Sequence, residues 1–174
     1  MRGLKIAVLA LTTSGCVLNS APRAEWGHDA YEGKEVLTSM HMAPTPAGRQ
    51  DTPLDLQLIH VKGDTKSVLV GTYFGTVQNR LHNLDCRTVE FAADGQPFQP
   101  VAVTWSQTVQ AQVRFTAELD PARVGVLGKT HELKVRLCGD EYAVDDGPWH
   151  GAYGRALGEF ANALAQGDPA AIQR

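Results

Sequence analysis

The sequence predicts a mainly β protein: an antiparallel, sandwich-like domain of about seven strands that ends in one amphipathic α-helix. Three observations lead to this prediction. Between residues 35 and 138, short runs alternate between apolar and polar side chains, a period typical of half-buried strands. Glycine, proline and aspartate separate these runs and indicate turns. From residue 149 onward the apolar spacing changes to three and four residues, which indicates a helix.

The first three strands are predicted between residues 35 and 74. Glu35–Met42 forms a possible short strand, and the proline-rich residues 43–53 that follow it predict a loop. Residues 54–61 begin with leucine at every second position and predict a longer strand. A turn-like sequence at 62–65 separates this strand from a further apolar run at 68–74, so the two runs together predict a β-hairpin.

Four further strands are predicted in the runs 86–92, 101–105, 113–117 and 133–137. The last run is the clearest, because its apolar residues alternate with glutamate, lysine and arginine. Asp94-Gly95, after the first of these runs, predicts a tight hairpin turn, because glycine accepts a positive φ without steric cost.

Two helical segments complete the predicted domain. Asp120-Pro121 is typical of a helix start, so residues 122–127 are predicted to form one short helical turn. The final helix is predicted to start near Asp146 and to end near Gly167, and residues 168–174 are expected to form a frayed tail. The apolar face of the final helix carries Trp149, Tyr153, Leu157, Phe160 and Leu164.

The composition suits a single globular domain and limits the class of partner. The chain has 174 residues, of which 43% are apolar and 20% charged, enough for one hydrophobic core. Its net charge of −3 lacks the basic excess of nucleic-acid-binding domains, so no nucleic-acid partner is expected. No apolar run reaches the length of about 18 residues that a membrane-spanning helix needs.

The first sixteen residues have the three-part layout of an export signal. A positive region with Arg2 and Lys5 precedes the apolar run 6–12, and small residues follow that run. The segment resembles a bacterial lipoprotein signal, with the lipobox-like sequence Thr13-Ser14-Gly15-Cys16.

This resemblance, which is confined to the signal, implies that residues 1–15 are removed and that Cys16 is acylated. It also implies an exported lipoprotein, and Val17 in place of an aspartate implies anchoring to the outer membrane, facing the periplasm. A plain secreted or cell-surface protein and an uncleaved anchor are the alternatives. Residues 16–33 are then expected to form a lipidated tether, and residues 34–167 the single periplasmic domain.

The three cysteines, Cys16, Cys86 and Cys138, fit an exported protein. If Cys16 carries lipid, the other two predict one disulfide, Cys86–Cys138, in an oxidising compartment. Such a bond would contribute about 3–4 kcal/mol in the chain-entropy picture. Two buried free thiols are the alternative. The sequence has no Cys-x-x-Cys, so it predicts neither a thioredoxin-type site nor a thiolate zinc site.

No sequence motif points to catalysis. The chain lacks Gly-x-Ser-x-Gly, Ser-x-x-Lys and His-Glu-x-x-His, so no catalytic residue, metal ligand or cofactor is predicted. Met40-His41-Met42 has donors that suit Cu(I). However, alternation along a strand separates the histidine from both methionines, which favours a strand edge whose two methionines lie in the core. The acidic residues within 140–146 depart from calcium-loop spacing and are interpreted as a solvated loop.

The tryptophans and two of the histidines are interpreted as packing or surface residues. Trp105 and Trp149 are expected to pack in the core or against the helix. Trp26, within the expected tether, either packs or touches lipid or a partner. His131 and His150 are expected to have no catalytic role.

These observations favour a non-enzymatic protein. The first hypothesis is a membrane-anchored lipoprotein that binds an envelope protein as an accessory of an assembly or secretion complex. The second is an inhibitor or immunity protein against a periplasmic hydrolase, and the third is a hydrolase with an unrecognised site. The sequence identifies neither the binding surface nor the oligomeric state.

Overall fold

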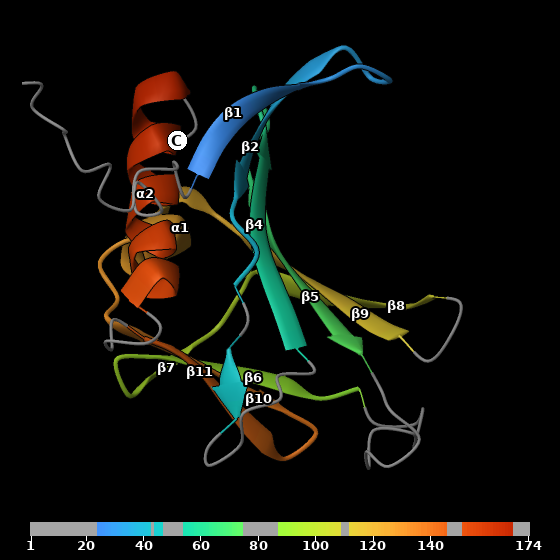
Figure 1. Cartoon of the computed structure of the whole chain (residues 1–174), viewed down its shortest axis with the longest axis vertical. Coiled ribbons are helices and arrows are strands. Elements are labelled where there is room, and N and C mark those ends of the chain that lie inside the picture. Colours follow the sequence, from blue (N-terminus) through green and yellow to red (C-terminus); the bar gives the residue numbers. More distant parts are fainter. Residues whose placement is uncertain are drawn as a thin grey trace, which may run out of the picture.

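A computed structural model of the chain describes residues 24–42, 44–46, 54–74, 87–108, 112–145 and 151–168. These residues form two antiparallel sheets and two helices, and this mainly β, sandwich-like fold confirms the predicted fold class (Figure 1). Figure 1 shows the smaller sheet lying across one end of the larger sheet, with both helices on the same side of the molecule.

The larger sheet has six strands in the order β1-β2-β4-β5-β9-β8, so β1 and β8 form its edges. Its strands are β1 (Ala24–Asp29), β2 (Lys34–Ser39), β4 (Leu54–Val61), β5 (Ser67–Phe74), β8 (Ala102–Thr108) and β9 (Gln112–Leu119).

The smaller sheet has five strands in the order β3-β11-β10-β6-β7, so β3 and β7 form its edges. Its strands are β3 (Thr45–Pro46), β6 (Val89–Ala93), β7 (Gln96–Phe98), β10 (Glu132–Leu137) and β11 (Asp140–Asp145).

The two predicted hairpins are both present. In the first, β4 pairs with β5 from Leu54 opposite Tyr73 to His60 opposite Ser67, and the turn carries Gly63 at a φ of 89°. In the second, Asp94-Gly95 connects β6 to β7 with φ values of 49° and 75°. Glycine reaches such angles without the strain that a side chain adds, which explains these turns.

The core lies between the sheets and under the helices. The leucines of β4, and Leu133, Val135 and Leu137 of β10, alternate inward as predicted, and the buried side chains form one continuous cluster. Phe115 of β9 is 1% exposed and lies over Gly71 of β5. A Cβ at position 71 would overlap the Phe115 ring, so the glycine makes room for the largest fully buried side chain.

Both helices follow their sequence signals. The first, α1 (Pro121–Leu127), has Asp120 as its N-cap, and the Asp120 carboxylate accepts a hydrogen bond of 2.9 Å from the Arg123 N–H. The second, α2 (Gly151–Gly167), packs on β1 and β2 and crosses α1 where Gly128 meets Ala161. The side chains of Phe160 and Leu164 on its apolar face are buried.

The strand pattern differs from the prediction in two places. The described residues form eleven strands, against about seven predicted, because short or weakly apolar strands such as β3 and β7 carry little periodic signal. Residues 140–145 form β11 and not a solvated loop, and Tyr142 and Val144 point into the core from it.

The expected tether is also revised. Residues 24–33, assigned to the tether from the sequence, form β1 and the turn into β2. The strand is held in place by Trp26, whose Nε1–H donates a hydrogen bond of 3.2 Å to the Ala163 carbonyl of α2. Tertiary packing therefore orders a segment whose composition alone favoured a linker.

Several predicted features lie outside the described residues. These are the signal, Cys16, Cys86, Trp149, His150 and the end of the tail. Within the described part of the chain, no helix has the length and hydropathy needed to cross a membrane.

Candidate functional site

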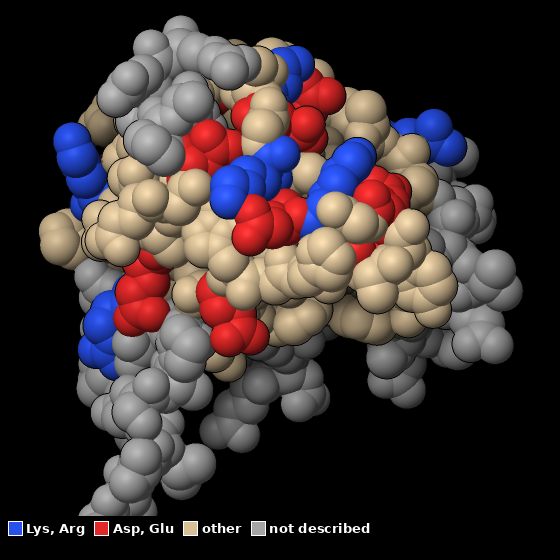
Figure 2. Space-filling model, turned by 90° about the horizontal axis from the view of Figure 1, so that it is seen from above, with Lys and Arg blue, Asp and Glu red and all other residues tan. Residues whose placement is uncertain are grey.

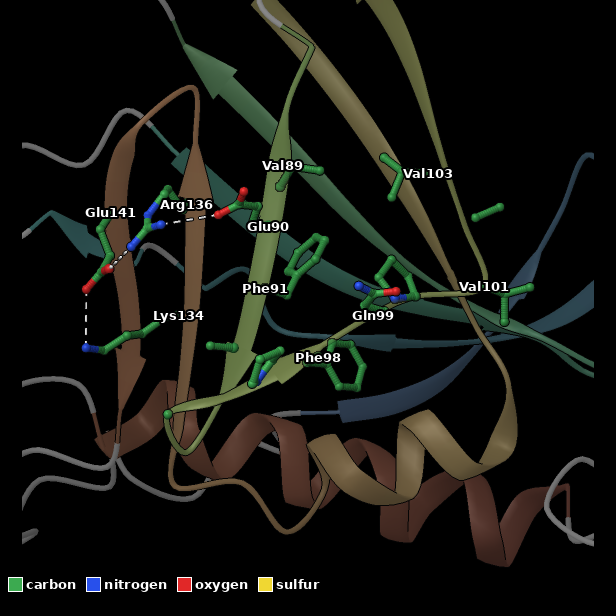
Figure 3. A pocket seen from close by; sticks show the side chains of 15 residues that line it. Val89, Glu90, Phe91, Phe98, Gln99, Val101, Val103, Lys134, Arg136 and Glu141 are labelled. Atoms are coloured by element: carbon green, nitrogen blue, oxygen red, sulfur yellow. Dashed lines mark hydrogen bonds and ion pairs between the residues drawn. The ribbon is translucent and has the colours of Figure 1, made fainter.

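A groove of about 620 Å³ opens between the edges of the two sheets. We call it the edge groove. One wall comes from β6 and β7, and the other from the β7–β8 connection and the start of β8 (Figure 3). Its apolar lining includes Val89, Phe91, Phe98, Val101 and Val103, and its charged rim consists of Glu90, Lys134, Arg136 and Glu141.

The groove exists because neither sheet continues across it. β8 pairs with β9 on one side and is the last strand of its sheet. β7 pairs with β6 only from Phe91 to Ala93, so Val89 and Glu90 have no strand beside them on that side among the described residues. Each wall of the groove therefore includes a stretch of open strand edge.

Four aromatic rings form a row behind the groove and connect the two sheets. The ring centroids of Phe98 and Phe91 lie 6.4 Å apart, those of Phe91 and Phe115 5.9 Å, and those of Phe115 and Trp105 5.7 Å. The first two contacts are edge-on, a geometry that aromatic pairs prefer. Phe91 and Phe98 both line the groove and belong to the hydrophobic core, so the apolar wall is continuous with that core.

The inward face of β8 is incompletely covered. Val103 lies opposite Ala117, and Trp105 lies opposite Phe115, so both point between the sheets. Ala117 and Phe115 are at most 1% exposed, whereas Val103 and Trp105 are only partly buried. Val101, at the start of the strand, is 44% exposed. Apolar surface is thus available on the groove side of β8.

The charged rim is balanced and internally paired. Arg136 lies 3.3 Å from Glu90 and 3.5 Å from Glu141, and Lys134 lies 3.2 Å from Glu141. The hydrogen bond with Lys134 holds the pKa of Glu141 below its ordinary value, and the same bond raises the pKa of Lys134. Figure 3 shows Glu90 pointing toward Arg136, while Phe91 points the other way, toward the β8 wall.

The first helix fixes the wall that leads into β8. The Arg123 guanidinium donates a hydrogen bond to the carbonyl oxygen of Gln99 and pairs with Asp120, the N-cap of α1. Gln99 lies in the β7–β8 connection, which lines the groove. The position of this wall is therefore coupled to α1.

A second polar cluster has the residue types of a hydrolase triad. His60 Nδ1 lies 3.1 Å from Ser67 Oγ, and His60 Nε2 lies 3.5 Å from Asp168 Oδ2. His60 is 1% exposed, Ser67 3% and Asp168 7%, and none of them lines the edge groove. A nucleophile must meet its substrate, so we interpret this buried cluster as structural.

The buried cluster ties α2 to the larger sheet. Asp168 Oδ2 accepts a hydrogen bond of 2.7 Å from the Gly63 N–H in the β4–β5 turn. Trp26 packs edge-on against His60 with 6.1 Å between ring centroids, and Lys62 lies over the Trp26 ring. The cluster therefore joins the end of α2 to β1 and to the β4–β5 hairpin.

Charged side chains of opposite sign are intermixed on the described surface. On the face that Figure 2 shows, basic and acidic side chains lie next to one another and are not segregated by sign. Among the described residues, the exposed ion pairs Lys34–Glu32, Lys62–Glu35 and Lys66–Glu118 likewise place opposite charges side by side. Such exposed pairs contribute little stability and do not form an electrostatic docking surface.

The residues considered for a metal from the sequence do not come together. Met42 is fully buried and Met40 packs against the core, while His41 is exposed and lies 2.7 Å from Asp55. In the part of the chain that the structure describes, no three histidine, cysteine, aspartate or glutamate side chains gather closely enough to hold a metal ion.

Cys138 directly follows β10, in the turn to β11, with a φ of 53°, and its N–H donates a hydrogen bond of 3.1 Å to the Thr88 carbonyl. This contact lies beside the N-terminal end of β6, two residues from position 86 in the chain. Cys86 itself lies outside the described residues, as does Cys16, so the disulfide and the acylation stay predictions.

Comparison of the chain with models of known protein families, with curated proteins and with solved structures finds no match.

The sequence interpretation missed the edge groove. Phe91, Phe98, Trp105 and Phe115 are far apart in the chain, and their contact depends on how the two sheets pack. One signal was present: the predicted strand at 101–105 contains no charged residue on either face. An edge strand usually carries charge or proline, so this run is unusual for an edge.

Proposed function

We propose that this protein is an exported, lipid-anchored module that binds a partner protein of the cell envelope through the edge groove. The observation that carries the proposal is the groove itself, a concavity with an apolar wall, open strand edges and a base of packed aromatic rings. Protein-binding sites commonly combine a central apolar area with a polar rim, and the edge groove has both.

The chemistry of the groove favours binding over catalysis. Its four charged side chains pair with one another, so each carboxylate is already engaged by a cation rather than free as an acid or base. The buried Ser67, His60 and Asp168 lie outside its lining. A non-enzymatic accessory in an envelope or secretion complex is the function that this arrangement supports best.

Export and anchoring support the choice of compartment. The proposal places acylated Cys16 at the amino end of the mature chain and a Cys86–Cys138 disulfide at the β6–β10 junction. The hydrogen bond from the Cys138 N–H to the Thr88 carbonyl supports the disulfide, because it brings Cys138 beside the chain leading from position 86.

Site-specific photo-crosslinking in the producing bacterium tests the proposal. A benzophenone amino acid replaces Val101, which lines the groove, or Thr104, which is exposed on the opposite face of β8. We expect irradiation to link the position-101 variant, and not the position-104 variant, to one reproducible envelope protein. Equal labelling at both positions, or none at either, would argue against a partner in the groove.

The anchor is tested in the same cells. We expect mass spectrometry to find acyl chains on Cys16 of the protein from the membrane fraction. A Cys16→Ser variant is expected to leave that fraction and to lose most of its crosslinking. A Cys16→Ser protein that remains acylated and membrane-bound would exclude this anchor.

A further inference from the structure

We propose that the edge groove binds its partner by strand addition. An extended, uncharged segment of the partner pairs with the outer edge of β8, and its alternate apolar side chains enter the groove toward Phe91 and Phe98. This inference rests on the proposed function and names how that same site recognises its partner.

The four sheet edges of the described chain differ in how well they are protected against pairing with another strand. β3 has two residues and contains Pro46, and β7 has three residues and contains Pro97. β1 carries charged residues and packs under α2. Short length, proline, charge and a covering helix are the usual ways in which proteins prevent an edge from pairing with another chain.

Among the described residues, β8 has none of these protections. It is seven residues long, its sequence AVTWSQT contains neither charge nor proline, and no described strand lies on its outer side. At about 3.3 Å per residue it offers roughly 23 Å of edge. Backbone N–H and C=O groups of alternate residues point outward from such an edge, and a further strand is the ligand that satisfies them.

The groove defines the side chains of the incoming strand. Val101 and Val103 lie on one wall, and Phe91 and Phe98 on the other (Figure 3). A strand added to β8 turns every second side chain toward the face that carries Val103 and Trp105, and the side chains beside the start of β8 reach this apolar space. Apolar side chains at alternate positions of the partner therefore fill the groove, and the other positions face solvent.

The charged rim defines which side chains the bound segment lacks. Glu90, Glu141, Lys134 and Arg136 sum to zero charge and are engaged with one another. A charged side chain entering the groove would have to break one of these pairs or remain unpaired against the phenyl rings. The recognised segment is therefore uncharged along the stretch that pairs with β8.

Peptides provide the first test. Linear twelve-residue peptides are selected from a random display library for binding to the full mature chain. The tightest-binding peptide is then synthesised as a series of variants, each with a single N-methyl group at a different backbone nitrogen. We expect methylation at alternate positions to weaken binding about tenfold, because each lost N–H removes a hydrogen bond. Methylation at the intervening positions is expected to change binding about twofold or less.

Two matched variants locate the binding. Val101→Lys places a charge in the groove, and Thr104→Lys places the same charge on the opposite, exposed face of β8. We expect Val101→Lys to weaken peptide binding about tenfold or more and Thr104→Lys to leave it within about twofold. Both residues are exposed to solvent, and equal thermal midpoints of the two variants check that both fold.

The outcomes separate this inference from the proposed function. A selected peptide whose N-methyl scan lacks alternation overturns strand addition, while crosslinking at position 101 would still support a groove partner. A position-101 crosslink in cells with no peptide selected in vitro also overturns an extended segment as the recognised element. A concentration-dependent dimer that Val101→Lys abolishes would identify a second copy of this chain as the occupant and overturn the proposal.

Discussion

At the scale of single residues, close packing at Gly71 determines how the two sheets meet. The glycine lets the Phe115 ring lie directly on β5, and Phe115 in turn contacts both Phe91 and Trp105. The aromatic row behind the edge groove therefore depends on one missing side chain. Glycine in the interior of a strand usually lowers stability, and here the close contact of the Phe115 ring with β5 compensates for that cost.

Two glycine substitutions are predicted to have opposite effects on stability. Gly71→Ala is expected to lower the free energy of unfolding by about 1–3 kcal/mol, because its Cβ overlaps the Phe115 ring. Gly125→Ala, in α1 with open space around it, is expected to raise that energy by about 0.5–1 kcal/mol. Urea unfolding measures both, and an unchanged Gly71→Ala midpoint would contradict the packing described here.

A second residue-scale prediction concerns the rim of the groove. The pKa of Glu141 is lowered chiefly by its hydrogen bond to Lys134, so Lys134→Met is expected to move it back toward its ordinary value. A lowered carboxyl pKa stabilises the fold above the ordinary pKa, and this contribution is lost as the pH falls through the lowered one. Carbon-detected NMR titration of the Glu141 carboxyl measures the shift; identical midpoints in the two proteins would refute it.

At the scale of elements, the C-terminal helix is held at its end as well as along its face. Phe160 and Leu164 bury the apolar side of α2, as the helical spacing predicts. Asp168, assigned from the sequence to a frayed tail, accepts the Gly63 N–H and approaches His60. The polar end of the helix is thereby fixed to the β4–β5 turn.

Removing this contact is predicted to weaken the attachment of α2. Asp168→Ala is expected to lower the free energy of unfolding by about 1–3 kcal/mol, because the Gly63 N–H loses its acceptor. Asp168→Asn keeps an acceptor oxygen and is expected to cost less. Hydrogen exchange of the last turn of α2 should accelerate in the alanine variant; equal exchange in parent and alanine variant would mean that the contact is not needed.

At the scale of the whole molecule, the described elements cover one side of the junction between the two sheets more fully than the other. The helices and β1 cover the side where α2 packs, and the edge groove remains on the side of β8 and β6. The proposed disulfide would lie in the smaller sheet, at the end of β10 that adjoins β6. It would restrain the unfolded chain more than it would reshape the groove.

Reduction is predicted to destabilise the protein as a whole. If Cys86 and Cys138 are paired, a reducing agent is expected to lower the free energy of unfolding by up to about 3–4 kcal/mol. The double variant Cys86→Ser/Cys138→Ser is expected to match the reduced protein and to be insensitive to the reagent. Free-thiol titration of the unfolded, unreduced protein that finds both thiols would exclude the bond.

Local patterns determined much of the architecture. Alternating leucines defined β4 and β10, Asp94-Gly95 defined the β6–β7 turn, and Asp120-Pro121 defined the start of α1. These features depend on contacts within a few residues, for which periodicity and turn chemistry are sufficient. The predicted N-terminal export signal is likewise a local pattern, and the proposed compartment follows from that prediction alone.

Tertiary structure decided which further segments form strands and where the edge groove lies. Trp26 makes residues 24–29 a strand by docking on α2, and Tyr142 and Val144 make an acidic segment a core strand. The edge groove requires β8 to be an outer strand and Phe91 to meet Phe115 across the sheets. Sheet order and packing between sheets join residues far apart in the chain. The sequence alone therefore determined the strongly periodic strands and the turns between them, whereas only the folded molecule determined the remaining strands and the site between the sheets.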